Sequence, residues 1–118
     1  MAEVINVNMK DLSPEIHRAL QAMREVAYAD GQLPGRHKLL TALAIAVSVK
    51  CEPCIRMYVE KAVQAGASRD ETIEVLNVAM AMGGCVGEAW VQKALVAFES
   101  VSRKSQRAVP GSDCCSNG

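Results

Sequence analysis

Cys51 and Cys54, three positions apart, are the residues of this chain whose types and spacing are best suited to chemistry. They frame the sequence Cys-Glu-Pro-Cys, in which Pro53 stiffens the link between them. If a helix begins here, Cys51 lies where free backbone N–H groups and the helix dipole lower the pKa of a thiol. Cys54 returns to the same side one turn later, so the pair predicts thiol–disulfide exchange.

Three other interpretations of the pair stay open. Free cysteine commonly fills helical cores, and the spacing could be a coincidence. A structural zinc site normally needs four ligands, and here only Cys114 and Cys115 could complete the set. Two cysteines around Glu-Pro at a helix start are a poor core pattern, and the C-terminal segment is a weak second half for a zinc site. We therefore favour exchange and expect neither a metal ion nor a cofactor at the site.

The composition predicts an all-α fold. Half of the 118 residues are apolar but only 3% are aromatic, which favours helices packed through small side chains over a β-sandwich. We expect residues 1–108 to form a single domain, a compact bundle of about five to six helices. The Pro, Gly and Ser of residues 109–118 predict a flexible tail that carries Cys114 and Cys115.

Start and stop signals place the first helices. Ser13 and Pro14 open one that Gly31 can close in a left-handed conformation. A second, apolar on almost every side, runs from near Arg36 to about Lys50 and is expected to be buried all round. The apolar residues that recur at helical spacing in the first helix are Ile16, Leu20, Met23, Val26 and Ala27.

Pro53 is tolerated in a first helical turn, so a central third helix should begin near Glu52, with the cysteine pair at its start. It is expected to run to Ala65 and to end at Gly66. A capping box of Ser68 and Glu71 opens a fourth helix. Gly83-Gly84 should stop it before a fifth helix over 88–103. The side chains expected to face inward in the fourth helix are Ile73, Leu76, Val78, Ala79 and Met80.

The chain resembles the carboxymuconolactone decarboxylase-like superfamily, specifically its alkyl hydroperoxide reductase D-like branch. The resemblance covers about half the chain, "LPGRHKLLTALAIAVSVKCEPCIRMYVEKAVQAGASRDETIEVLNVAMAMGGC" and on to Trp90. An apolar helix runs into the Cys-x-x-Cys pair, followed by "KAVQAGAS", an acidic "DETIEV" and a "MAMGG" terminator in the family's order and spacing. This combination is far more specific than a lone Cys-x-x-Cys pair.

The resemblance implies a compact helical fold that assembles into trimers or hexamers. It also implies a disulfide-reductase or peroxidase activity, antioxidant in kind, carried by Cys51 and Cys54. Cys54 corresponds to the cysteine that meets peroxide and Cys51 to its resolving partner. The helix-start argument instead makes Cys51 the more activated thiol, so the order of attack stays open. The decarboxylase branch itself usually lacks the pair.

Two positions depart from the family pattern. The branch usually has a histidine four residues after the second cysteine, where this chain has Tyr58. It usually has a glutamate twelve residues before the first cysteine, where this chain has Leu39. Tyrosine titrates near pH 10, so we expect Tyr58 to act only as a hydrogen-bond partner. Activation then falls to the helix end, to Glu52 or Glu60, or to a residue that the sequence does not identify.

Three further cysteines are candidate auxiliary thiols. Cys85 follows Gly84, where a small residue chosen for close packing is favoured over a third thiol within reach of the pair. Cys114 and Cys115 are adjacent in the predicted tail. Because soft thiolates select soft metals, they could pass electrons or a thiophilic ion to Cys51 and Cys54.

Charge and hydropathy exclude several classes of partner. The formal net charge is zero with no block of like charge, so neither nucleic acid nor anionic lipid is expected. The longest apolar run, 39–49, is too short to span a bilayer. The first twelve residues have no basic segment followed by an apolar core, so we do not expect a secretory signal. We therefore expect a cytoplasmic homo-oligomer that exchanges electrons with a thiol or disulfide protein or a small molecule. The alternatives are a non-catalytic thiol protein that binds a soft metal or metalloid, and a family member with an assembly role only.

Overall fold

The computed structural model of the protein describes residues 5 and 7–108, without the side chains of 105–108. Every element in this part of the chain is a helix, which confirms the predicted all-α fold. The predicted tail, with Cys114 and Cys115, lies outside the described residues, and what we expect of it stays a prediction. The helices are α1 (Met9–Leu12), α2 (Pro14–Tyr28), α3 (Gly35–Ser48), α4 (Glu52–Gln64) and α5 (Arg69–Ala108).

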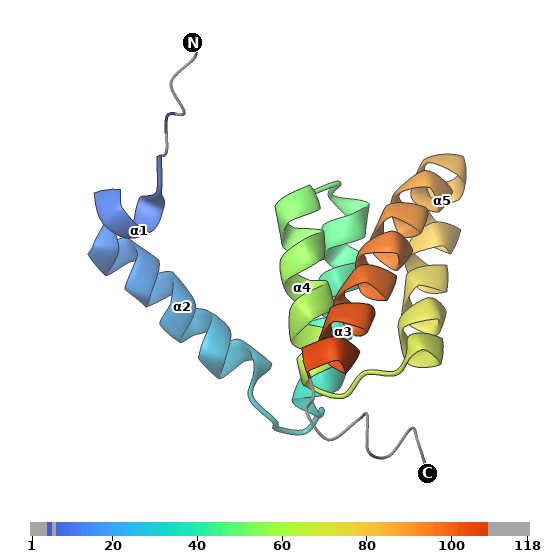
Figure 1. Cartoon of the computed structure of the whole chain (residues 1–118), viewed down its shortest axis with the longest axis horizontal. Coiled ribbons are helices and arrows are strands. Elements are labelled where there is room, and N and C mark those ends of the chain that lie inside the picture. The colour runs from blue at the N-terminus through green and yellow to red at the C-terminus, as the bar shows by residue number, and fades with distance from the viewer. Residues whose placement is uncertain (1–4, 6, 109–118) are drawn as a thin grey trace.

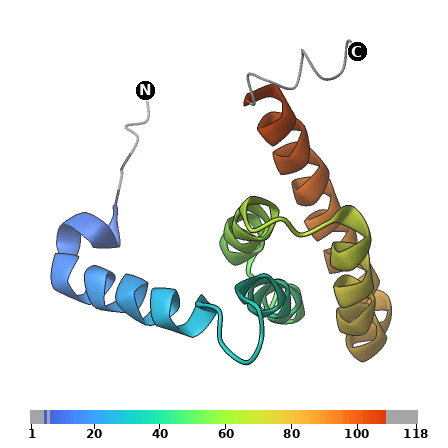
Figure 2. The same ribbon diagram turned by 90° about the horizontal axis from the view of Figure 1, so that it is seen from below.

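Helices α3, α4 and α5 pack on one another as a bundle, and α2 stands on the far side of α3 and α4 from α5 (Figure 1 and Figure 2). The core lies where the three bundle helices meet. Its most buried apolar side chains are Leu40, Leu43, Ala46 and Val47 of α3, Ile55, Val59 and Ala62 of α4, and Leu76, Ala94 and Phe98 of α5. Helix α3 is less enclosed than predicted, since Ile45 on its outer face is exposed.

A tight corner joins α3 to α4. Lys50 has a φ of 60°; its N–H donates to the carbonyl of Val47 at 3.1 Å, and the N–H of Cys51 donates to that of Ala46 at 3.0 Å. This pair of hydrogen bonds is a Schellman motif, which satisfies the last carbonyls of a helix and stops it. The predicted break at Lys50 and Cys51 is therefore confirmed, with Pro53 in the first turn of α4.

The turn from α4 to α5 follows the sequence signals closely. Gly66 has a φ of 88° and ends α4 in the same way. The predicted capping box is present, since the N–H of Glu71 donates to Ser68 Oγ at 3.0 Å and the N–H of Ser68 donates to Glu71 Oε1 at 2.9 Å.

Helix α5 contains the predicted fourth and fifth helices as two segments that meet at a kink. Gly84, with a φ of 60° and a ψ of −140°, is not helical, so the predicted stop is a bend within one long element. One expected core residue is wrong: Val78 is 64% exposed. It lies two positions after the fully buried Leu76, which places it about 200° around the helix axis.

The loop after α2 does not end the helix as predicted. The glycines with positive φ are Gly66 and Gly84, and α2 ends at Tyr28 with Ala29 in an extended conformation, so the left-handed closure at Gly31 is wrong. A hydrogen bond between residues nine positions apart holds the loop instead: Lys38 Nζ donates to the carbonyl of Ala29 at 2.7 Å.

The apolar face of α2 is uncovered in the single chain. None of its side chains is buried, and Ile16, Met23 and Val26 are each more than 60% exposed. Within residues 5 and 7–108, the helices are too short or too polar for any of them to be a candidate membrane span.

Candidate dithiol site

Cys51 and Cys54 are joined by a disulfide at the start of α4, with their Cα atoms 5.2 Å apart. Cys51 is the N-cap residue of α4, and its Sγ accepts a hydrogen bond from the N–H of Cys54 at 3.4 Å. Neither cysteine is buried, since both are partly exposed. This exposure argues against the interpretation of the pair as filler of a sealed core.

One ion pair lies next to Cys51. Lys93 Nζ donates to Glu52 Oε1 at 2.7 Å, and this hydrogen bond lowers the pKa of Glu52 below its ordinary value. Lys93 also lies over the ring of Trp90, 4.9 Å from its centroid. A carboxylate held in its charged form by a cation is a weak base, so Glu52 is a poor substitute for the missing glutamate. Glu60, the other candidate, is exposed.

A small cavity of about 170 Å³ opens beside Cys54. Apolar side chains of α3 form most of its wall, and α2 and α4 each contribute a tyrosine. The lining residues are Tyr28, Ala42, Ile45, Ala46, Val49, Cys54 and Tyr58. The polar side-chain groups of these residues are one sulfur and two phenolic hydroxyls.

Those two hydroxyls bind each other. The oxygens of Tyr28 and Tyr58 lie 2.7 Å apart, and their rings meet edge to face with centroids at 5.5 Å. Burial, followed by the hydrogen bond to Tyr58, raises the pKa of Tyr28 to about 12. The position where the family pattern has a histidine thus holds one half of a tyrosine couple.

Tyr28 is the site residue that sequence reasoning missed. It lies thirty positions before Tyr58, at the end of another helix, where no local spacing indicates a role. The one available signal is compositional, since these are the only two tyrosines of the chain. Leu39, at the family's glutamate position, is buried in the core and has no proton to exchange.

The third candidate thiol, Cys85, is free and exposed on α5 directly after the kink. Close packing within this chain is therefore not its role, contrary to the favoured expectation. Lys50 and Gly83 line a common pocket, so Cys85 lies at the same end of the bundle as Cys51. In the described part of the chain, no three His, Cys, Asp or Glu side chains gather as a metal ion would require.

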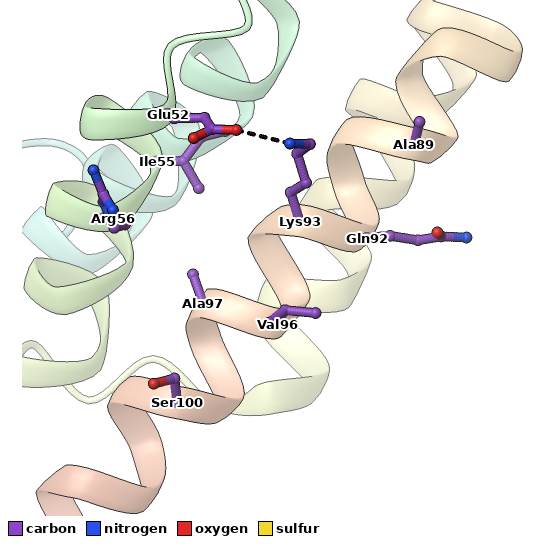
Figure 3. A pocket seen from close by; sticks show the side chains of 9 residues that line it. All are labelled: Glu52, Ile55, Arg56, Ala89, Gln92, Lys93, Val96, Ala97 and Ser100. Atoms are coloured by element: carbon purple, nitrogen blue, oxygen red, sulfur yellow. Dashed lines mark hydrogen bonds and ion pairs between the residues drawn. The ribbon is translucent and has the colours of Figure 1, made fainter.

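A larger groove of about 610 Å³ separates the first turns of α4 from the second segment of α5. Figure 3 shows Lys93 reaching across it to Glu52, above a floor that includes Ile55 and Ala97. Neither cysteine lines this groove. The smaller cavity, which contains Cys54, is therefore the candidate site for chemistry, and the groove is a neighbouring surface.

Comparison with known proteins agrees with the fold. The model of the carboxymuconolactone decarboxylase family matches residues 14–97. An uncharacterised protein of Cupriavidus necator is 34% identical over 89 residues, which are 75% of this chain and 79% of that protein.

Two solved structures of the same family also superpose on the chain. One, from Legionella pneumophila, has 33% identity and a TM-score of 0.76, over 80% of this chain and 84% of its own. The other, from Thermotoga maritima and with a suggested role in antioxidative response, has 25% identity and a TM-score of 0.71, over 79% of this chain and 96% of its own. The chain belongs to the carboxymuconolactone decarboxylase family.

Proposed function

We propose that the protein is a thiol–disulfide oxidoreductase, of disulfide-reductase or peroxidase type, with Cys51 and Cys54 as its redox-active pair. The observation that carries the proposal is the partly exposed disulfide at the first turn of α4, beside a cavity that Cys54 lines. The suggested antioxidative role of the Thermotoga maritima relative supports the same class of chemistry.

The helix start supplies the activation that a base would otherwise give. In the reduced protein a thiolate at Cys51 stays at the N-cap of α4, within reach of the N–H of Cys54 and of the positive end of the helix dipole. Both lower the pKa of a thiol, and the thiolate is the nucleophile. This activation requires neither a histidine at position 58 nor a glutamate at position 39.

The exchange reaction balances with the two cysteines alone. One thiolate of the reduced pair attacks a sulfur of the substrate disulfide RSSR′, forms a mixed disulfide and releases R′S⁻. The second thiolate attacks the mixed disulfide, closes the Cys51–Cys54 bond and releases RS⁻. The two protons of the dithiol pass to the two released thiols. With a peroxide ROOH, the first attack gives a sulfenic acid and ROH, and the second closes the disulfide and releases water.

The proposal includes association of several copies and an external electron donor, either a thiol or disulfide protein or a small thiol. Association is supported by the uncovered apolar face of α2. A donor is required because each turnover leaves the pair oxidised. Its surface would have to reach the first turn of α4, where Cys51 is partly exposed.

Thiol counting by mass spectrometry tests the proposal. The fully reduced chain is treated with a small organic disulfide or hydroperoxide, and the remaining thiols are then alkylated and mapped to peptides. We expect two thiols to be lost together and recovered as a Cys51–Cys54 disulfide, and we expect Cys51→Ser or Cys54→Ser to abolish the paired loss. The Cys85→Ser variant, counted in the same way, shows whether the pair suffices without the third thiol.

The same experiment contains the contrary outcomes. If Cys51 and Cys54 remain free thiols after treatment with the oxidant, the pair is not redox-active, and the family member with an assembly role only is favoured. Tight binding of mercury or arsenite, combined with no reduction of a small disulfide, would favour the non-catalytic thiol protein instead.

A further inference from the structure

We propose that Tyr28 is a positioning residue of the dithiol site. It holds the Tyr58 hydroxyl so that the two tyrosines together donate a hydrogen bond to Cys54 Sγ when the disulfide opens. The inference rests on the proposed function only in taking Cys51 and Cys54 as the reacting pair, because the hydrogen bond acts on the acidity of a thiol whether or not a substrate turns over.

The geometry brings the three groups together from two helices. Tyr58 follows Cys54 by four residues, so the two side chains share one face of α4. Tyr28 arrives from the end of α2 and places its oxygen 2.7 Å from that of Tyr58. All three residues line the same cavity of about 170 Å³, whose remaining wall is apolar. Among the side chains that line this cavity, the two hydroxyls are the hydrogen-bond donors that a charged Cys54 sulfur would find.

Counting protons shows why the couple is a donor. Two hydroxyls carry two protons, and their mutual hydrogen bond uses one of them. The hydroxyl that accepts this bond keeps its own proton for a second acceptor. A tyrosine without its partner would have no fixed direction for that proton, which is why we assign a positioning role to Tyr28.

The acidity of Tyr28 fits donation and not base catalysis. Burial and the bond to Tyr58 raise the pKa of Tyr28 to about 12, so it keeps its proton throughout the neutral range. The couple therefore stabilises a thiolate and does not remove a proton from a thiol.

The start of α3 holds the backbone of Tyr28 in place. A Cβ atom on Gly35 would lie 2.6 Å from the carbonyl oxygen of Tyr28, so the two segments touch where only glycine fits. The N–H of Gly35 donates to Asp30 Oδ1 at 2.6 Å, and Lys38 binds the carbonyl of Ala29. These contacts clamp the last turn of α2 against α3 and so deliver the Tyr28 hydroxyl to the cavity.

The couple acts when Cys54 is the leaving group. An external thiolate RS⁻ from the electron donor attacks Cys51 Sγ, a bond forms between these sulfurs, and the Cys51–Cys54 bond breaks. Its electron pair departs on Cys54 Sγ, which becomes a thiolate. A leaving thiol with a lower pKa leaves faster, and a hydrogen bond to the charged form lowers that pKa. No proton needs to move in this step.

The experiment is the pH dependence of alkylation of Cys54 in the reduced full-length chain, resolved by peptide mass mapping. For Tyr28→Phe we expect the rate at pH 7 to fall about 3- to 10-fold, which corresponds to a pKa rise of roughly half to one unit, with convergence on the wild-type rate once the thiol is fully ionised. Tyr58→Phe should show at least as large an effect. Ile45→Val is the matched control, since it alters the same cavity wall without a hydroxyl.

A second variant moves Tyr28 without removing its hydroxyl. Gly35→Ala displaces the end of α2 and should shift the alkylation profile in the same direction, provided that circular dichroism shows an intact fold. Unchanged profiles in Tyr28→Phe would overturn the inference, and so would a rate lowered equally at every pH, which indicates altered access.

The outcomes also separate this inference from the proposed function. If the wild-type chain fails to reduce a disulfide while Tyr28→Phe still shifts the profile, the proposed function is wrong and the role of Tyr28 stands. If turnover is normal and the profile is unchanged, the role of Tyr28 is wrong and the proposed function stands.

Discussion

Lys50 adopts a backbone conformation that glycine usually provides. It stands at the left-handed position of the motif that ends α3, with a φ of 60°, directly before Cys51. At the equivalent place after α4 the chain uses Gly66. For a residue with a Cβ atom this conformation costs about 1–2 kcal/mol. Lys50, which turns the chain from α3 toward Cys51, therefore has a strained backbone conformation.

Replacing Lys50 by glycine should relieve this strain. Allowing for the extra entropy of glycine in the unfolded chain, we expect Lys50→Gly to raise the free energy of unfolding by about 0.5–1 kcal/mol, measured by urea denaturation. Val49→Gly is the control, because Val49 has a φ of −92° and should lose stability instead. If the Lys50→Gly variant were no more stable than the wild type, the backbone at Lys50 would not be strained.

Glu71 contributes stability that depends on pH. A hydrogen bond from the backbone N–H of Ser68, together with Arg36, lowers its pKa. A carboxyl whose pKa is lowered in the folded state stabilises the fold above its unfolded value of about 4.3, and this contribution is lost as the pH falls through the lowered pKa.

The test compares Glu71→Gln, which keeps an acceptor oxygen without a charge, with the wild type in urea at pH 6 and pH 3. We expect the wild type to be the more stable at pH 6 and the difference to shrink at pH 3. Ser68→Ala removes the hydroxyl that caps the N–H of Glu71 and should cost about 1 kcal/mol at pH 6. Because this hydroxyl also helps to lower the pKa of Glu71, part of that cost should likewise be lost at pH 3. A difference for Glu71→Gln that is independent of pH would contradict the assignment.

At the scale of the element, one glycine determines the bend of α5. Gly84 has dihedral angles that residues with a Cβ atom rarely adopt, while a Cβ there would meet no atom within 4 Å. Gly84→Ala should therefore destabilise the fold through strain alone, by about 1–3 kcal/mol.

The neighbouring Gly83 is a matched control for that prediction. It also has open space around its Cα atom, but its φ is not positive. Gly83→Ala should therefore be neutral or raise stability by about 0.4–1 kcal/mol. Thermal unfolding measures the stability of both variants. Gly84→Ala reports the cost of backbone strain, and Gly83→Ala reports the gain from a less flexible unfolded chain at the adjacent position. Equal effects would show that the kink does not require the conformation of Gly84.

The sequence predicted those helix ends that local chemistry decides. Pro53 after Cys51, Gly66 after α4 and the capping box of Ser68 and Glu71 each act within four residues, and each is found where predicted. The end of α2 was mispredicted because distant groups decide it. Gly31 offered a left-handed closure, but the bond from Lys38 to the carbonyl of Ala29 holds the chain extended after Tyr28.

At the scale of the whole molecule, the site is assembled from α2, α3 and α4. The sequence identified the contribution of α4, which carries the cysteines. Tyr58 could be named because it stands four residues after Cys54, at the position where the family pattern has a histidine. Tyr28 could not, because its contact with Tyr58 depends on where α2 lies, and no periodicity encodes that position. The exposure of Cys85 escaped prediction for the same reason, since it depends on the direction of α5 beyond its kink.

The uncovered face of α2 gives the last prediction, that copies of the chain cover it on association. Ile16, Leu20 and Met23 share one side of the helix and are all exposed in the single chain. Burying one such side chain fully contributes about 1.5–3 kcal/mol, so a face of three can drive association. We expect sedimentation velocity at tens of micromolar to show an oligomer, and we expect Leu20→Gln with Met23→Gln to shift it to the monomer.

The control for this pair lies on the opposite side of the same helix. Arg18→Gln with Glu25→Gln changes two exposed residues and, like the first pair of substitutions, leaves the net charge unchanged. Unlike the first pair, it leaves the apolar face intact. It should therefore retain the wild-type mass. A wild-type chain that sediments as a monomer would disprove the expected oligomer. Loss of mass in both variants would show that the polar side of α2 also contributes to the contact, because a contact confined to the apolar face cannot depend on Arg18 and Glu25.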